Sequence, residues 1–180
     1  MPKRKPDIEA IAANIKLIIF DVDGVLTDGR IILDSAVGEY KAFDVRDGHG
    51  IKMIQRVGVK VGIITGRKSE VVERRARELG IEFVHQGQKD KRIAYKAIKK
   101  DAGVTDDAHV CYVGDDIVDL PVMVQVGLPV AVADAEEYVK ERALIVTKRK
   151  GGRSAVREIT DMIIMAKGHW DETIKKYTEA

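Results

Sequence analysis

The chain of 180 residues carries 31 lysine and arginine residues against 29 aspartate and glutamate residues, which gives a formal net charge of +2. This near-neutral charge excludes a global attraction to nucleic acid or to a membrane surface, and the 5% of aromatic residues argue against a platform for single-stranded bases. The 45% of hydrophobic residues are enough for one folded domain. A single cysteine is typical of a reducing compartment, so we predict a cytoplasmic protein. No apolar run approaches the roughly 20 residues of a membrane span.

Short apolar runs alternate with amphipathic segments along the chain, and this pattern predicts βαβ units. The predicted strands are rich in β-branched residues and cover 17–20, 61–64, 83–85, 110–113, 130–132 and 144–146. The predicted helices lie between or after them and cover 50–57, 69–79, 90–102, 117–126, 136–143 and 154–167. We therefore expect an α/β fold, a Rossmann-like three-layer α/β/α architecture with a central, mostly parallel sheet.

One segment breaks this alternation. Residues 30–34 and 39–43 flank the short stretch 35–38, which predicts a β-hairpin. The hairpin is too small to be a second domain, so we expect a flap or an oligomer contact instead of a cap domain. Residues 1–168 are then a single domain, with its flap at 30–43, and residues 169–180 are a polar C-terminal tail.

Acidic residues follow two of the predicted strands. They are Asp21 and Asp23 after the first strand, and Asp115, Asp116 and Asp119 after the strand at 110–113. Neighbouring carboxylates repel, so they stay ionised only if a cation or hydrogen-bond donors compensate. At adjacent carboxyl ends of parallel strands these oxygens would form a cage that suits Mg²⁺. Either cluster alone could merely turn the chain and cap a helix, but the two together favour a metal site.

Groups that bind phosphate are also present. Thr65, Gly66 and Arg67 follow a predicted strand and supply a hydroxyl, a flexible backbone and a guanidinium. Lys91 lies near the start of a predicted helix and can offer an ammonium to a phosphoryl group. A lone lysine is usually solvated surface, yet the order in which these groups occur along the chain favours a phosphate site.

These motifs resemble, in order and approximate spacing, the four motifs of the haloacid-dehalogenase-like phosphatases. They are Asp21-Val22-Asp23-Gly24, Thr65-Gly66-Arg67, Lys91 and Gly114-Asp115-Asp116-Ile117-Val118-Asp119. Within that superfamily the chain resembles the 3-deoxy-D-manno-octulosonate 8-phosphate phosphatases over residues 16–168, through segments 26–29, 43–50, 64–68, 86–91, 130–135 and 151–158. The resemblance implies a Mg²⁺-dependent phosphoric monoester hydrolase of lipopolysaccharide sugar biosynthesis. It also implies a homotetramer in which hairpins and C-terminal segments of neighbouring subunits help close each site.

The resemblance implies catalytic roles for four residues. Asp21 would attack phosphorus and form an aspartyl-phosphate. Asp23 would protonate the leaving sugar alkoxide and then take a proton from the water that hydrolyses the intermediate. Thr65 and Lys91 would hold the phosphoryl oxygens.

A metal site and a sugar site are implied in the same way. Mg²⁺ would be bound by the carboxylates of Asp21 and Asp115 and by the main-chain carbonyl of Asp23. Asp116 and Asp119 would orient the phosphate-binding lysine or a metal-bound water. The small phosphorylated sugar acid would contact Asp23, Asp44, Val45, Arg46, Asp47, Gly48, Lys52, Arg67, Arg75 and Lys91, together with Arg153 from the same or a neighbouring subunit.

Two alternatives stay open at this point. The first is a phosphatase for a nine-carbon keto-sugar acid such as 2-keto-3-deoxynononate 9-phosphate, or one with broad sugar-phosphate tolerance. Lys52 and Asp44 stand where arginine and asparagine are common in the family, and arginine and lysine differ in how they bind a carboxylate. The second is a noncatalytic regulatory or interaction domain of the same fold. The intact acidic cluster argues against it, because a binding module does not need carboxylates that repel one another.

Overall fold

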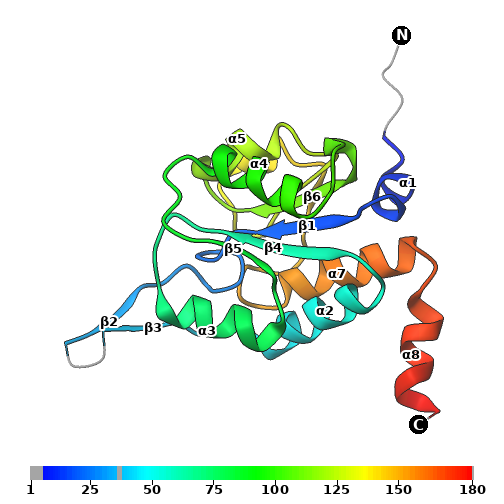
Figure 1. Ribbon diagram of the computed structural model, residues 1–180, viewed down its shortest axis with the longest axis horizontal. Coiled ribbons are helices and arrows are strands. Elements are labelled where there is room, and N and C mark those ends of the chain that lie inside the picture. Colours follow the sequence, from blue (N-terminus) through cyan, green and yellow to red (C-terminus); the bar gives the residue numbers. More distant parts are fainter. Residues whose placement is uncertain (1–5, 36–37, 180) are drawn as a thin grey trace.

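The computed structural model describes residues 6–35 and 38–179. Its centre is a six-stranded parallel sheet with the strand order β5-β4-β1-β6-β7-β8 (Figure 1). The strands are β1 (Leu17–Phe20), β4 (Lys60–Ile64), β5 (Phe83–His85), β6 (Val110–Gly114), β7 (Leu128–Ala131) and β8 (Ile145–Val146). All residues of β1 are buried, as expected for a central strand that is covered on both faces.

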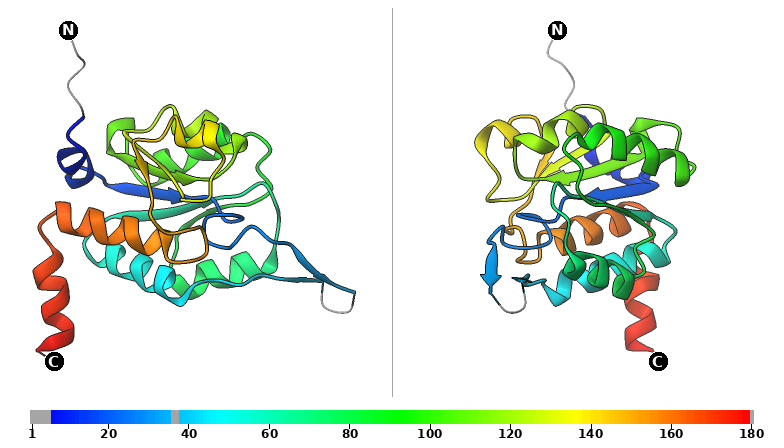
Figure 2. Two further views of the ribbon diagram at one scale, coloured as in Figure 1. Left: turned by 180° about the vertical axis from the view of Figure 1, so that it is seen from behind. Right: turned by 60° about the vertical axis from the view of Figure 1, so that its left-hand side comes forward.

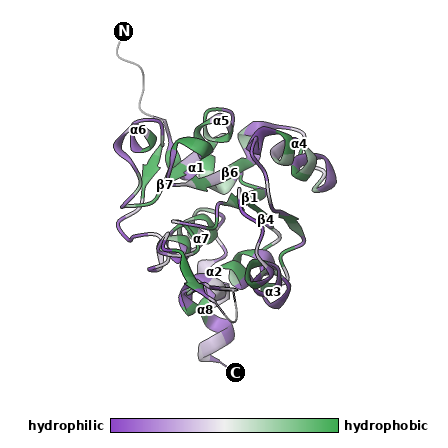
Figure 3. Ribbon diagram, turned by 90° about the vertical axis from the view of Figure 1, so that its left-hand side faces the viewer, coloured by the Kyte–Doolittle hydropathy of each residue, from purple (hydrophilic) through white to green (hydrophobic). Residues whose placement is uncertain are grey.

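Helices cover both faces of this sheet. They are α1 (Ile8–Ala13), α2 (Val45–Arg56), α3 (Glu70–Leu79), α4 (Lys91–Asp101), α5 (Leu120–Met123), α6 (Glu137–Lys140), α7 (Ala155–Ala166) and α8 (Trp170–Thr178), with 3-10 turns at Asp107–His109 and Ile117–Asp119. Figure 3 shows α4, α5 and α6 on one side of the sheet and α2, α3 and α7 on the other. The expected three-layer α/β/α fold is confirmed. No helix of the described part of the chain is long and apolar enough to cross a membrane.

A small antiparallel hairpin, β2 (Ile32–Asp34) and β3 (Gly38–Tyr40), leaves the sheet after β1. It projects from one end of the molecule, whereas α1 and α8 lie at the opposite end (Figure 2). The predicted hairpin is therefore confirmed, although its strands are shorter than the expected 30–34 and 39–43. Residues 36 and 37 of the predicted turn lie outside the described residues.

Helix α1 lies outside the predicted helices, α6 is shorter than the expected 136–143, and three further helices also differ from the sequence prediction. Helix α2 begins at Val45, well before residue 50, because the Asp44 carboxylate accepts a hydrogen bond from the Arg46 amide at 2.7 Å and caps the helix. The single helix predicted over 117–126 is a 3-10 turn followed by the short α5. Part of the segment 169–180 is the helix α8, whose Tyr177 hydroxyl accepts a hydrogen bond from Arg56 Nη1 at 2.7 Å.

Candidate active site

The sheet brings the two acidic motifs together at the carboxyl edge of β1 and β6. Phe20 pairs with Val113 in the parallel register of these strands. The Asp21 amide then donates to the Val113 carbonyl at 3.1 Å and extends this ladder by one residue. Asp21 and Asp115 therefore leave neighbouring strands at the edge where open α/β sheets bind their ligands.

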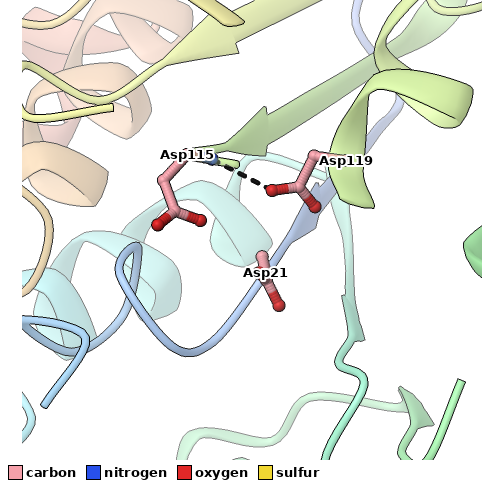
Figure 4. A group of neighbouring side chains, drawn as sticks. All are labelled: Asp21, Asp115 and Asp119. Atoms are coloured by element: carbon pink, nitrogen blue, oxygen red, sulfur yellow. Dashed lines mark hydrogen bonds between the residues drawn. The ribbon is translucent and has the colours of Figure 1, made fainter. Parts of the chain in front are cut away.

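Three aspartates form a compact group there, which we call the carboxylate cluster: Asp21, Asp115 and Asp119 (Figure 4). Each offers one carboxylate oxygen to a set whose members lie within 4.8 Å of one another. The ammonium of Lys91, the first residue of α4, lies 3.0 Å from Asp21 Oδ1 and 2.7 Å from Asp119 Oδ1. Lys91 is only 2% exposed, so this ion-paired group is shielded from solvent.

Asp119 and Asp115 differ in what holds them. Asp119 is fully buried and accepts hydrogen bonds from the Tyr112 hydroxyl at 2.6 Å and from the Asp115 amide at 3.0 Å (Figure 4). Both of its oxygens are therefore engaged by protein groups. Asp115 Oδ1, in contrast, is buried and has no hydrogen-bond partner among the described residues. The open ligand atoms of the cluster thus belong to Asp115 and Asp21, and Asp119 lies behind them.

The electrostatics of the cluster favour an added cation. Burial, followed by repulsion from Asp119, raises the pKa of Asp21 to about 7, although Lys91 opposes this rise. Burial and then repulsion from Asp119 and Asp21 raise the pKa of Asp115 to about 8. Burial lowers the pKa of Lys91, but the two neighbouring carboxylates raise it more, so the ammonium stays charged. One ammonium does not balance three carboxylates, and a hard divalent ion with oxygen ligands would.

Gly24 makes room for this arrangement. It adopts a φ of +92°, and a Cβ added there would lie 2.0 Å from Asp115 Oδ2. Any other residue at this position would both strain the backbone and push the Asp115 carboxylate aside. The glycine of the first acidic motif is therefore required by the aspartate of the second.

A cleft of about 410 Å³ opens above the cluster. Its lining consists of Asp21, Asp23, Gly29, Thr65, Gly66, Arg67, Gln88, Lys89, Lys91, Asp115, Asp116 and Val118. The four predicted motifs thus meet at one cleft, of a size that holds a small molecule. A larger cleft of about 670 Å³ between α1 and α7 lies elsewhere and contains none of these residues.

Asp23 has partners that the sequence motifs did not indicate. Its side chain is 21% exposed, and the Lys41 ammonium pairs with its Oδ1. Arg67 Nε lies 3.9 Å from Asp23 Oδ2, and Arg67 Nη2 lies 2.8 Å from Glu39 Oε1. Glu39 and Lys41 belong to the hairpin and stand two residues apart, so the alternation of an extended strand could have indicated that they share a face.

Two of the predicted sugar-binding residues bind the protein itself. Asp44 Oδ2 accepts a hydrogen bond from the Ser154 hydroxyl at 2.8 Å. The buried Asp47 accepts one from the Arg157 amide at 2.7 Å through Oδ1. These carboxylates therefore tie the start of α2 to the start of α7, and they do not line the cleft.

Six further predicted sugar-binding residues also lie outside the cleft lining: Val45, Arg46, Gly48, Lys52, Arg75 and Arg153. Arg75 stacks over the Phe43 ring at 5.7 Å and packs against Gly48. Arg153 is 69% exposed on its side chain and lies 3.7 Å from Asp28. Three further residues are exposed on the surface of α2: Val45, Arg46 and Lys52. Of the predicted sugar-binding set, the described cleft contains Asp23, Arg67 and Lys91.

Comparison with known proteins identifies relatives over nearly the whole chain. A family model described as haloacid dehalogenase-like hydrolase matches residues 46–127. The chain is 48% identical over 166 residues to the 3-deoxy-D-manno-octulosonate 8-phosphate phosphatase KdsC of Escherichia coli, a match that covers 92% of this chain and 88% of that protein.

Solved structures agree with this result. The crystal structure of 3-deoxy-D-manno-octulosonate 8-phosphate phosphatase from Yersinia pestis matches with a TM-score of 0.89 and 47% identity, covering 92% of this chain and 89% of that one. The enzyme of the same name from Moraxella catarrhalis, crystallised with a magnesium ion, a phosphate ion and a KDO molecule, matches with a TM-score of 0.92 and 39% identity. That match covers 96% of this chain and 98% of the other.

Proposed function

Because the chain belongs to the haloacid dehalogenase-like hydrolases and, within them, to the family of 3-deoxy-D-manno-octulosonate 8-phosphate phosphatases, we propose that its cleft hydrolyses this phosphomonoester to the free sugar acid and phosphate. The observation that carries the proposal is the carboxylate cluster with its buried Lys91, open to a cleft. The phosphate ion and KDO molecule in the Moraxella structure correspond to the two products of this reaction.

Mg²⁺ fits the residues that are present. Asp21 and Asp115 would hold it, together with the main-chain carbonyl of Asp23, because they supply hard oxygen ligands and Asp115 Oδ1 is buried without a partner among the described residues. When bound, the ion would reduce the electrostatic repulsion between the negatively charged carboxylate and the negatively charged phosphoryl group. The Moraxella relative was crystallised with this ion.

In the first step Asp21 acts as the nucleophile. One of its carboxylate oxygens forms a bond to phosphorus while the bond from phosphorus to the sugar oxygen breaks. Asp23 donates its proton to the leaving sugar oxygen, which would otherwise depart as a poorly stabilised alkoxide. Lys91 and Thr65, which line the same cleft, hold the phosphoryl oxygens during the transfer.

In the second step water hydrolyses the aspartyl-phosphate. The water oxygen bonds to phosphorus, the bond to the Asp21 oxygen breaks, and Asp23 takes the proton that the water loses. Asp119 does not reach the reacting atoms, because it is fully buried, but it holds the Lys91 ammonium at 2.7 Å. Its role is thus to keep that ammonium beside the nucleophile.

The sugar part of the substrate would be recognised at the rim of the cleft. The Arg67 side chain is 43% exposed there and can bind a carboxylate. Asp44, Asp47 and Arg75 lie away from the cleft and contact other parts of their own chain. In a homotetramer the exposed Arg153 would instead reach the cleft of a neighbouring subunit. We place the reaction in the cytoplasm, as part of lipopolysaccharide sugar biosynthesis.

Phosphate release from a panel of substrates tests this function. The panel contains 3-deoxy-D-manno-octulosonate 8-phosphate, 2-keto-3-deoxynononate 9-phosphate and simple hexose phosphates, each with Mg²⁺ and with excess chelator. We expect the highest kcat/KM for the eight-carbon acid, and no turnover with chelator. A higher kcat/KM for the nine-carbon acid would make that acid the assigned substrate. If none of the compounds were hydrolysed, the proposed enzymatic function would be refuted.

A further inference from the structure

A lysine at the base of the hairpin contacts Asp23, the general acid of the proposed reaction. Lys41 directly follows β3, and its ammonium pairs with Asp23 Oδ1. Only 1% of the Lys41 side chain is exposed. Glu39 Oε1 lies 3.4 Å from the Lys41 ammonium on the other side. A buried cation with two carboxylate partners is fixed in place, and it in turn fixes the carboxylates that it contacts.

The second oxygen of Asp23 has a different environment. Arg67 Nε lies 3.9 Å from Asp23 Oδ2, and the Arg67 side chain is 43% exposed at the cleft. Asp23 thus has one oxygen held by a buried ammonium and the other beside an exposed guanidinium that a bound anion can attract. Because Lys41 is covered, it acts on a ligand only through Asp23.

We propose that Lys41 is a positioning residue that orients the Asp23 carboxylate, so that Oδ2 faces the leaving-group oxygen of the substrate. This inference rests on the proposed function, in which Asp23 is the acid. Asp23 lies on a loop after β1, where its side chain could otherwise rotate, and proton transfer needs hydrogen-bond reach to the leaving oxygen. The orientation of the Asp23 carboxylate is then set by Lys41, next to the hairpin strand β3, as well as by the loop after β1.

Substrates with different leaving groups test this role in Lys41→Met. A sugar alkoxide needs a proton from Asp23 as it leaves, whereas the p-nitrophenolate of p-nitrophenyl phosphate leaves without one. We measure kcat/KM, which reports the steps up to formation of the aspartyl-phosphate and excludes its later hydrolysis, a step that both substrates share. We expect kcat/KM for 3-deoxy-D-manno-octulosonate 8-phosphate to fall by roughly 10²-fold and that for the aryl phosphate to change by less than about threefold.

Two further variants keep the result interpretable. Lys41→Arg retains a cation and is expected to recover part of the sugar-phosphate activity. Lys99→Met removes a lysine that pairs with Asp107 at the far end of α4, and it is expected to change neither substrate.

Equal losses on both substrates in Lys41→Met, or no loss on either, would overturn the inference while leaving the proposed function intact. Unequal losses without recovery in Lys41→Arg would also overturn it. Wild-type protein that hydrolyses neither substrate would overturn the proposed function, and the inference with it.

Discussion

Replacing Asp115 by asparagine is expected to stabilise the metal-free protein and to abolish its response to Mg²⁺. Asp115 shares the carboxylate cluster with Asp21 and Asp119, and within the described chain the Lys91 ammonium pairs with the latter two acids. Asparagine keeps the shape of the side chain and removes its charge. The repulsion within the cluster should therefore fall, while the hard ligand that a divalent cation needs is lost.

The size of the effect follows from the pKa of Asp115. Burial and the neighbouring carboxylates raise it from 3.8 to about 8. At 1.36 kcal/mol per pKa unit, ionising this group at pH 8 costs the fold on the order of 5 kcal/mol, and relaxation and entry of water reduce the expected gain to about 2 kcal/mol.

The sign of the pH dependence follows from linkage. The folded metal-free protein keeps a proton on Asp115 that the unfolded chain has already lost above about pH 4. The free energy of unfolding contributed by this group is therefore fully present below about pH 4 and is lost as the pH rises toward 8. The advantage of Asp115→Asn over the wild type should grow over the same range.

Urea unfolding measures this directly. We expect Asp115→Asn in excess chelator to exceed the wild type by about 2 kcal/mol at pH 8 and by clearly less at pH 5. Addition of Mg²⁺ should stabilise the wild type alone, because only a state that binds the ion gains from it. A variant less stable than the wild type at pH 8, or equal stabilisation of both by Mg²⁺, would refute the reasoning.

Three further outcomes follow from the site and the family. Lys91→Met leaves Asp21 and Asp119 buried without their ammonium, so its free energy of unfolding at pH 8 should fall by about 3 kcal/mol or more, and an unchanged urea midpoint would contradict that pairing. Gly24→Ala introduces a Cβ 2.0 Å from Asp115 Oδ2, so calorimetry should find the Mg²⁺ affinity reduced by about tenfold or more. A Gly24→Ala variant that binds Mg²⁺ as tightly as the wild type would contradict this role of the glycine. Light scattering at assay concentration should give the mass of a tetramer, and a monomer would remove the neighbouring subunit from the proposed site.

The core of the site could be predicted because its signals are local. Asp21 and Asp115 each follow a buried apolar strand directly, and parallel strands bring their carboxyl ends to one edge. Thr65 follows a third strand, and Lys91 begins a helix after a fourth. The strand positions predicted that the two aspartates meet, whereas the order of the groups along the chain and the family resemblance added Thr65 and Lys91 to the same site.

Other parts depend on contacts between distant segments. Lys41 reaches Asp23 only because the hairpin folds back beside the catalytic loop, and neither residue type nor spacing specifies that approach. Asp44 was predicted to bind the sugar, and in the described chain its carboxylate caps α2 and binds Ser154, a residue 110 positions away. Such pairings arise from the packing of α2 against α7, which a single sequence does not encode locally.

The rate of phosphate release from 3-deoxy-D-manno-octulosonate 8-phosphate by Asp21→Asn, at saturating Mg²⁺, tests the central claim most directly. A matched control is Asp107→Asn, which changes an aspartate paired with Lys99 at the far end of α4. We predict that kcat falls by more than about 10³-fold in Asp21→Asn and stays near the wild-type value in Asp107→Asn. A kcat of Asp21→Asn within about tenfold of the wild type would contradict the assignment of Asp21 as the nucleophile.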